Sequence, residues 1–210
     1  MTELIFVAAI VLVAWFAAGT IWNVGRGRAL MRWMQSGLSA LGERTTVRWL
    51  GSSAVEMVIR EGKAPFASVT LVIFLEARDT PWTWALGRAR GRRDTLIIRG
   101  ILRRVPQVEL EALDATSWLG REALGRVPKE WNISQAAANG GLVVHYAGTG
   151  SLECASALLA EARRNGLDAM RLSVRRTEPQ FQIHVRFPDQ GQPARDFFEA
   201  VRAITERALA

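Results

Sequence analysis

Residues that often carry catalysis or bind metals are scarce in this chain of 210 residues. It has a single cysteine, Cys154, and two histidines, His145 and His184. One cysteine cannot form an internal disulfide, which fits a reducing compartment, and Cys154 is expected to be a small buried side chain on a helix. Both histidines fall within expected strands, where a structural role is the usual one.

Recognisable catalytic motifs are missing as well. The sequence has no phosphate-binding glycine loop, nucleophile elbow, zinc-spaced set of cysteine and histidine, or metalloprotease helix. We therefore predict no catalytic residues, no cofactor, no metal site and no small-molecule substrate. An enzyme that uses Cys154 or His145 is the alternative, and selective thiol reactivity at neutral pH would support it.

Lysine is nearly absent. Lys63 and Lys129 are the two lysines among 27 basic residues, so the other 25 are arginines. Acidic residues number 20, and the net charge is +7. Such a domain attracts an anionic membrane leaflet or a nucleic acid. A G+C-rich genome and selection for anion contacts both explain the preference for arginine.

What the chain does have is one long hydrophobic run, from Leu4 to Val24. At about 1.5 Å of helical rise per residue this run spans roughly 30 Å, the thickness of a hydrocarbon core. The run predicts a transmembrane anchor over residues 1–25. A cleaved signal peptide is the alternative, but it would have a cationic start and a shorter apolar core. The side chains expected to hold the anchor in the bilayer are Leu4, Phe6, Val11, Trp15 and Trp22.

A juxtamembrane basic group, Arg26, Arg28 and Arg32, follows the run closely. Because basic residues beside a span tend to stay in the cytoplasm, we expect the N-terminus outside and the C-terminal domain in the cytoplasm. Residues 26–42 have apolar side chains at helical spacing and predict an amphipathic helix. This helix could lie on the bilayer surface or pack its apolar face onto the domain.

The remaining residues, 43–210, predict one α+β domain, with a place for a subdivision near 128–141. The expected fold is an N-terminal transmembrane helix followed by a mainly antiparallel sheet packed with helices. We expect residues 105–107, Val-Pro-Gln, to form a turn or bulge between two successive strands. Expected strands cover 45–50, 54–60, 68–76, 94–103, 108–113, 142–146, 167–175 and 180–187, and expected helices cover 117–124, 152–164 and 194–209.

The connection over residues 79–93, DTPWTWALGRARGRR, combines indoles with guanidinium groups. At a membrane the rings would lie among headgroups and the cations would meet lipid phosphates. The same side chains suit ribosomal or other RNA, through phosphate contacts and stacking. A third interpretation is that the tryptophans cap the core and the arginines form a solvated loop. The candidate lipid or ribosome contacts are Trp82, Trp84, Arg88, Arg90, Arg92 and Arg93.

In their arrangement these segments resemble the calumin-type family, single-span membrane proteins of the endoplasmic reticulum that join the Asterix chaperone in the complex assisting multipass membrane proteins. The resemblance covers nearly the whole chain. It rests on the basic exit WNVGRGRALMRWM and on the strands in RTTVRWLG, SVTLVIFLEARDTPWTWAL and DTLIIRGIL. Towards the C-terminus it rests on LLAEARRNGLDAMRLSV and FQIHVRFPD.

The resemblance implies a non-catalytic scaffold or accessory factor in membrane-protein insertion and biogenesis, on the cytosolic membrane face near a translocon and ribosome. The expected partners are then the lipid bilayer, translocon or other integral membrane proteins, and ribosomal RNA contacted through arginines. Two alternatives stay open on the sequence alone. One is a structural subunit of another membrane complex, and the other is a membrane-anchored ligand-binding module.

Overall fold

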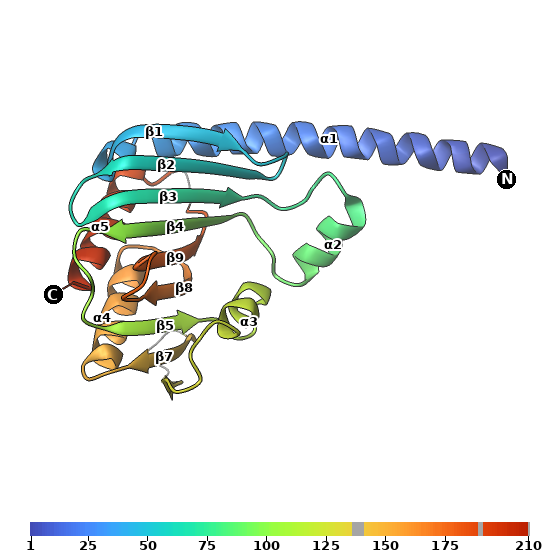
Figure 1. Ribbon diagram of the computed structural model, residues 1–210. Coiled ribbons are helices and arrows are strands. Elements are labelled where there is room, and N and C mark those ends of the chain that lie inside the picture. Colours follow the sequence, from blue (N-terminus) through green and yellow to red (C-terminus); the bar gives the residue numbers. More distant parts are fainter. Residues whose placement is uncertain (136–140, 189–190, 210) are drawn as a thin grey trace.

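The protein combines a long N-terminal helix with a nine-stranded antiparallel sheet and further helices (Figure 1). The computed structural model describes residues 1–135, 141–188 and 191–209. This architecture confirms the α+β class expected from the sequence. The segment 128–141, expected as a place for a subdivision, lies partly outside the described residues, and the strands on both sides of it belong to the same sheet.

The strands lie in the order β1-β2-β3-β4-β9-β8-β5-β7-β6, and all pairs are antiparallel. They are β1 (Gly42–Trp49), β2 (Ala54–Gly62), β3 (Phe66–Phe74), β4 (Thr95–Leu102), β5 (Glu109–Leu113), β6 (Asn132–Ser134), β7 (Val143–Ala147), β8 (Ala169–Val174) and β9 (Phe181–Arg186). The helices are α1 (Thr2–Gln35), the 3₁₀ turn η1 (Leu38–Ala40), α2 (Pro81–Ala89), α3 (Trp118–Leu124), α4 (Ser151–Arg164) and α5 (Ala194–Arg207).

The expected turn at residues 105–107 is wrong. It would make β4 and β5 neighbours, but β9 and β8 lie between them in the sheet. Pairing β4 with β9 aligns Leu96 with Val185 and Ile98 with Ile183, which places four apolar side chains in the buried core. Because this register is set by distant strands, the local sequence around residues 105–107 does not reveal it.

The first helix continues without a break from the expected anchor into the juxtamembrane segment (Figure 1). Its residues are exposed up to Ala18. Beyond that point the buried residues recur every three or four positions, so they share one face of the helix and lie against the domain. These buried residues are Gly19, Asn23, Gly27, Leu30 and Met34. The chain thus has one helix long and apolar enough to cross a membrane among its described residues.

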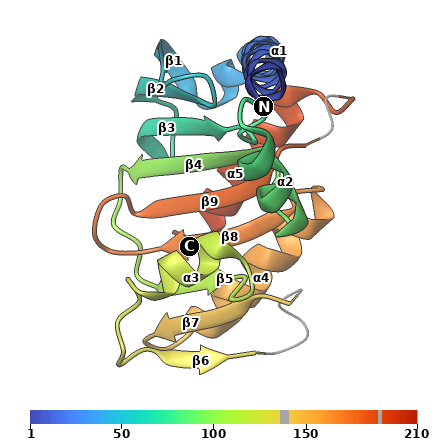
Figure 2. The ribbon, with the colours of Figure 1, turned by 90° about the vertical axis from the view of Figure 1, so that its right-hand side faces the viewer.

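The core lies between one face of the sheet and the layer formed by α4, α5, η1 and the end of α1 (Figures 1 and 2). Strand side chains alternate between the two faces, so Leu96 and Ile98 enter this core whereas Ile97 and Arg99 point to the opposite face. Trp33 secures the end of α1, because its indole N–H donates to the carbonyl of Gln192 at 2.8 Å. The second face of the sheet is left for other contacts.

Gly19 and Gly25 offer a matched test of how α1 is seated. A Cβ at Gly19 would lie 2.3 Å from the carbonyl oxygen of Arg78, whereas a Cβ at Gly25 meets nothing within 4 Å. We expect Gly19→Ala to lower the free energy of unfolding by roughly 1–3 kcal/mol, as overpacking against backbone does. Gly25→Ala should leave it unchanged or raise it by up to about 1 kcal/mol, because alanine favours helix.

The measurement is urea unfolding of the full chain in detergent. Equal effects of the two substitutions would mean that α1 does not pack on the domain as described.

Candidate functional site

A buried polar network, which we call the clamp, ties α1 to the domain. It consists of Asn23 and Arg26 on α1 together with Glu76, Arg78 and Asp94. The Arg78 guanidinium donates to both carboxylate oxygens of Asp94, at 3.1 and 3.2 Å, and to the Asn23 side-chain oxygen at 3.1 Å. Asn23 in turn donates to the backbone carbonyl of Glu76 at 3.0 Å, and Arg26 lies 3.4 Å from Asp94. Charge-assisted, two-point bonds of this kind define orientation as well as proximity.

The second helix, α2, stands directly beside α1. The indole N–H of Trp15 donates to the carbonyl of Arg78 at 3.0 Å, and its ring lies 6.2 Å from the ring of Trp84. Trp84 donates to the carboxylate of Glu76 at 2.8 Å, and Arg88 pairs with the same carboxylate at 3.3 Å. The chain around α2 therefore reaches the level of Trp15, well inside the hydrophobic run of α1.

The structure separates the six expected contact residues into two groups. Trp84 and Arg88 are held by the buried Glu76, whereas Trp82 remains 56% exposed. The other three, Arg90, Arg92 and Arg93, follow at the end of α2 and line a cleft. Residues 79–93 were expected to be a connection between strands. In the structure most of this connection is a helix that begins at Pro81.

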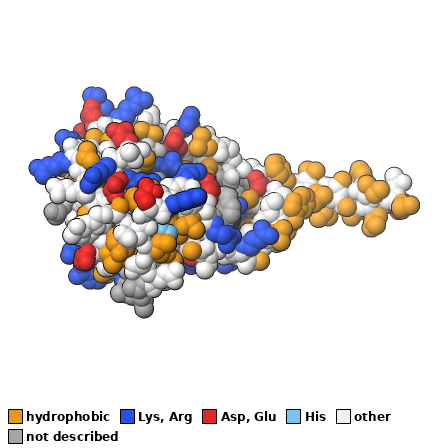
Figure 3. Space-filling view, turned by 60° about the horizontal axis from the view of Figure 1, so that its bottom comes forward, with side chains coloured by type: hydrophobic (Ala, Val, Ile, Leu, Met, Phe, Trp, Pro, Cys, Tyr) orange, Lys and Arg blue, Asp and Glu red, His pale blue; other side chains and the backbone are white. Residues whose placement is uncertain are grey.

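The other expected residues lie on α1. Leu4, Phe6, Val11 and Trp22 are exposed apolar side chains, as an anchor in lipid requires, and Figure 3 shows the projecting helix covered by such side chains. Arg28 and Arg32 are exposed, while Arg26 is half-buried against the clamp.

The cleft has a volume of about 860 Å³ and lies between α2 and α3, on the sheet face opposite the core. Figure 2 shows both helices facing the same way as the N-terminus of α1. Ile97, Gln182 and His184 lie in its floor, and Phe74 and Leu86 add apolar surface. Seven arginines and one glutamate make up its charged lining: Arg90, Arg92, Arg93, Arg99, Arg121, Arg126, Arg171 and Glu122.

His184 lines this cleft and has a buried polar atom that is unsatisfied. The residue is 4% exposed, and its Nδ1 has no hydrogen-bond partner among the described residues. Burial, followed by the charges of Arg171 and Arg99, lowers the pKa of the ring to about 3, so the ring is neutral. The side-chain nitrogen of Gln182 lies 2.5 Å from Nε2. The Gln182 amide thus pairs with Nε2, and Nδ1 is the ring nitrogen that lacks a partner.

Acidic side chains neutralise only part of the positive charge in the cleft. The carboxylate of Glu111 is fully buried and accepts from the guanidinium of Arg171, from Ser173 at 2.7 Å and from Arg175 at 3.0 Å. Arg99, on β4, has no acidic partner among the residues that the structure describes. The cleft therefore keeps a positive charge, which is suited to an oxyanion.

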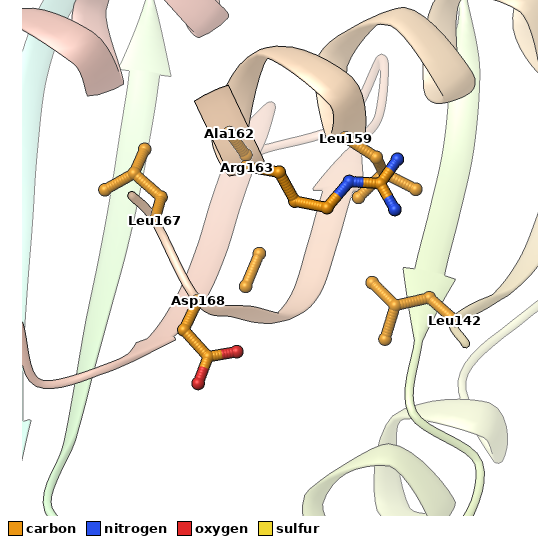
Figure 4. Close-up of a pocket in the computed structure, with 7 residues that line it drawn as sticks. Leu142, Leu159, Ala162, Arg163, Leu167 and Asp168 are labelled. Carbon is orange, nitrogen blue, oxygen red and sulfur yellow. The ribbon is translucent and has the colours of Figure 1, made fainter. Parts of the chain in front are cut away.

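Other chemistry has less support in the geometry. Burial raises the pKa of the half-buried Cys154 thiol, which disfavours the reactive thiolate at neutral pH. Among the described residues, no group of three or more histidine, cysteine or acidic side chains could hold a metal ion. A second cavity beneath α4 measures about 90 Å³ and is lined by Leu142, Leu159 and Leu167, with Arg163 and Asp168 at its sides (Figure 4). It has room for a few water molecules only.

The sequence analysis missed the floor of the cleft and the contribution of α3. A usable signal was present, because β9 has polar residues at the alternate positions Gln182 and His184, and β4 has Thr95 and Arg99 on the same face with Ile97 between them. Such alternation indicates a sheet face that is not covered by the apolar core. The arginines of α3 had no comparable signal, since their proximity to β4 depends on the order of the strands.

Comparison with protein-family models finds no match, and a search of curated proteins finds no similar sequence. The calumin-type resemblance therefore stays a prediction that rests on the arrangement of segments along the chain.

The buried neutral state of His184 predicts a pH-dependent stability. Below a pH of about 6.5 the unfolded chain protonates this histidine while the folded chain does not, so the free energy of unfolding falls as the pH falls towards 3. Between about pH 7.5 and about pH 5.5 this effect amounts to roughly 1.4 kcal/mol.

Urea unfolding of the wild type and His184→Gln at these two pH values isolates the effect, because every other titrating group is shared. The variant should lose less stability on acidification. A loss as large as that of the wild type would contradict a buried neutral His184.

Proposed function

We propose that this protein is a non-catalytic, membrane-anchored binding module whose cleft between α2 and α3 binds an anionic ligand at the membrane face. The observation that carries the proposal is the cleft itself, which is lined by seven arginines and by the buried His184. Its volume falls within the range of small-molecule and cofactor sites.

The charges in the cleft favour an anion over a neutral ligand. Its single acidic side chain, Glu122, is paired with Arg126 at 2.9 Å. The guanidinium of Arg121 is held by the carbonyl of Thr116 at 2.7 Å, and a held guanidinium loses less freedom when it binds a phosphate or carboxylate. An anionic ligand would thus gain several charge-assisted hydrogen bonds from groups that are already in place.

A scaffold role in membrane-protein biogenesis is the broader form of this proposal. It rests on the resemblance to the calumin-type family and on the exposed arginines, which suit a ribosome as well as a lipid. The anion-binding cleft does not depend on that role. An anion-binding cleft is equally compatible with a subunit of another membrane complex.

Binding of inorganic pyrophosphate to the full chain in detergent, followed by calorimetry at low salt, tests the cleft. We expect Arg99→Gln to weaken binding about tenfold, because it removes one charge-assisted hydrogen bond. Arg60→Gln is the matched control, since Arg60 is an exposed arginine on β2 that does not line the cleft. An equal effect of the two substitutions, or no binding by the wild type, would contradict the proposal.

We also propose that the N-terminus lies outside and the C-terminal domain in the cytoplasm, on the basis of Arg26, Arg28 and Arg32 directly after the run. In intact cells, externally added protease should then leave the domain whole and cut it only after lysis. Moving the positive charge should weaken the preference: Arg28→Glu together with Arg32→Glu is expected to give a mixed orientation. Digestion of the wild-type domain from outside would reverse the assignment.

A further inference from the structure

We propose that the ligand of the cleft is the phosphate headgroup of an anionic phospholipid, taken from the same bilayer that α1 enters. This inference rests on the proposed function and names the ligand of the same site. Three features carry it: the depth at which the domain meets α1, the surface of α2, and the end of the sheet at which α2 and α3 lie beside the cleft (Figure 1).

The depth follows from α1. Its exposed apolar stretch ends at Ala18, because Gly19 already touches the backbone of Arg78. Residues 2–18 at about 1.5 Å of rise per residue span roughly 25 Å, slightly less than a hydrocarbon core. Since the clamp fixes the domain to α1, the surface around Arg78 must lie at the boundary between headgroups and acyl chains.

The surface of α2 fits that depth. Trp82 is 56% exposed and Leu86 is 55% exposed, while Trp84 is turned towards Trp15 and Glu76. A helix with exposed indole and leucine side chains on one side and arginines at its end is typical of an interfacial segment. In this position Trp82 would lie among the headgroups, where indoles are enriched.

The cleft is next to this interface. Leu86 and Gly87 of α2 form part of its wall, and α2, α3 and the N-terminus of α1 all face the viewer in Figure 2. Phe74, which is 43% exposed, and Leu86 provide apolar contacts. The arginines and His184 provide polar contacts deeper in the cleft. A phospholipid has the same division, with an anionic headgroup joined to an apolar glycerol and acyl region.

Lipid fits better than RNA for two reasons that the geometry supplies. The exposed indole of Trp82 projects from a helix placed against the hydrophobic run, so in a bilayer it meets lipid rather than a nucleic acid base. The arginines of the cleft also converge on one compact space, whereas RNA contacts extend along a backbone. We therefore commit to the lipid, and RNA binding becomes an outcome of the test.

The test is native mass spectrometry of the full chain in detergent, titrated with phosphatidic acid or with phosphatidylcholine. We expect one phosphatidic acid bound, with at least a tenfold preference over phosphatidylcholine. Arg99→Gln combined with Arg121→Gln should abolish the preference. The control, Arg60→Gln combined with Arg104→Gln, removes the same charge from exposed positions outside the cleft and should keep the preference.

Two further measurements distinguish a failure of the anion site from a failure of the lipid assignment. If pyrophosphate binds in the cleft but the preference for phosphatidic acid is absent or survives in the cleft variant, the anion site stands and its lipid ligand is overturned. If neither binds, both proposals fail. An RNA oligonucleotide that displaces phosphatidic acid and binds more tightly would also overturn the lipid assignment.

A photoreactive phosphatidic acid keeps the test decisive if the double variant does not fold. With the wild-type chain, cross-links should map to peptides of α2, α3 and β4. Cross-links confined to α1 would show annular lipid only and would contradict a lipid in the cleft.

Discussion

The bond pattern around Asp94 is the constraint on which the rest of the structure depends. Its carboxylate accepts from the Arg78 guanidinium and from the backbone N–H of Glu76, and it lies beside Arg26 of α1. Asp94 and Glu76 are nearly buried, and a buried charge is tolerated only when it is fully paired, so the network has little freedom to rearrange. The clamp thus joins the domain directly to α1, the helix that is long and apolar enough to cross a membrane. The orientation of every other surface relative to α1 follows from this clamp.

The second face of the sheet, which the core does not cover, forms the floor of the cleft because of that arrangement. The helices α4 and α5 cover one face, and the order of the strands places β4, β9 and β8 at the centre of the other. With α2 held by Glu76 on one side and α3 following β5 on the other, the central strands become the floor of a cleft. The polar residues Arg99, Gln182 and His184 in these strands are consistent with a sheet face that the apolar core does not cover.

Much of the fold could be predicted from local sequence signals. Period-two runs located eight strands within a few residues, and the helical pattern before Asn165 and Gly166 located α4 and its end, where Gly166 has a φ of 70°. Non-local pairing could not be predicted, so β4 and β5 were wrongly expected to be neighbours. The candidate site divides in the same way. The arginines after α2 stand out as a local cluster, whereas Arg99, Arg121 and His184 come together only through the strand order.

Positive charge is neutralised by acidic groups on one side of the cleft and not on the other. This difference distinguishes a structural network from a binding site. Glu111 neutralises part of the charge of Arg171 and Arg175, and Ser173 completes its hydrogen bonds, so this part of the sheet is satisfied without a ligand. On β4 and β9, Arg99 and the Nδ1 of His184 have no comparable partners among the described residues. The arginines of the cleft repel one another, and the neutral His184 leaves a buried polar atom unpaired, which lowers the stability of the unliganded fold. Uncompensated charges and unpaired polar atoms beside a fully paired network are typical of functional sites, because a bound anion can pair with them.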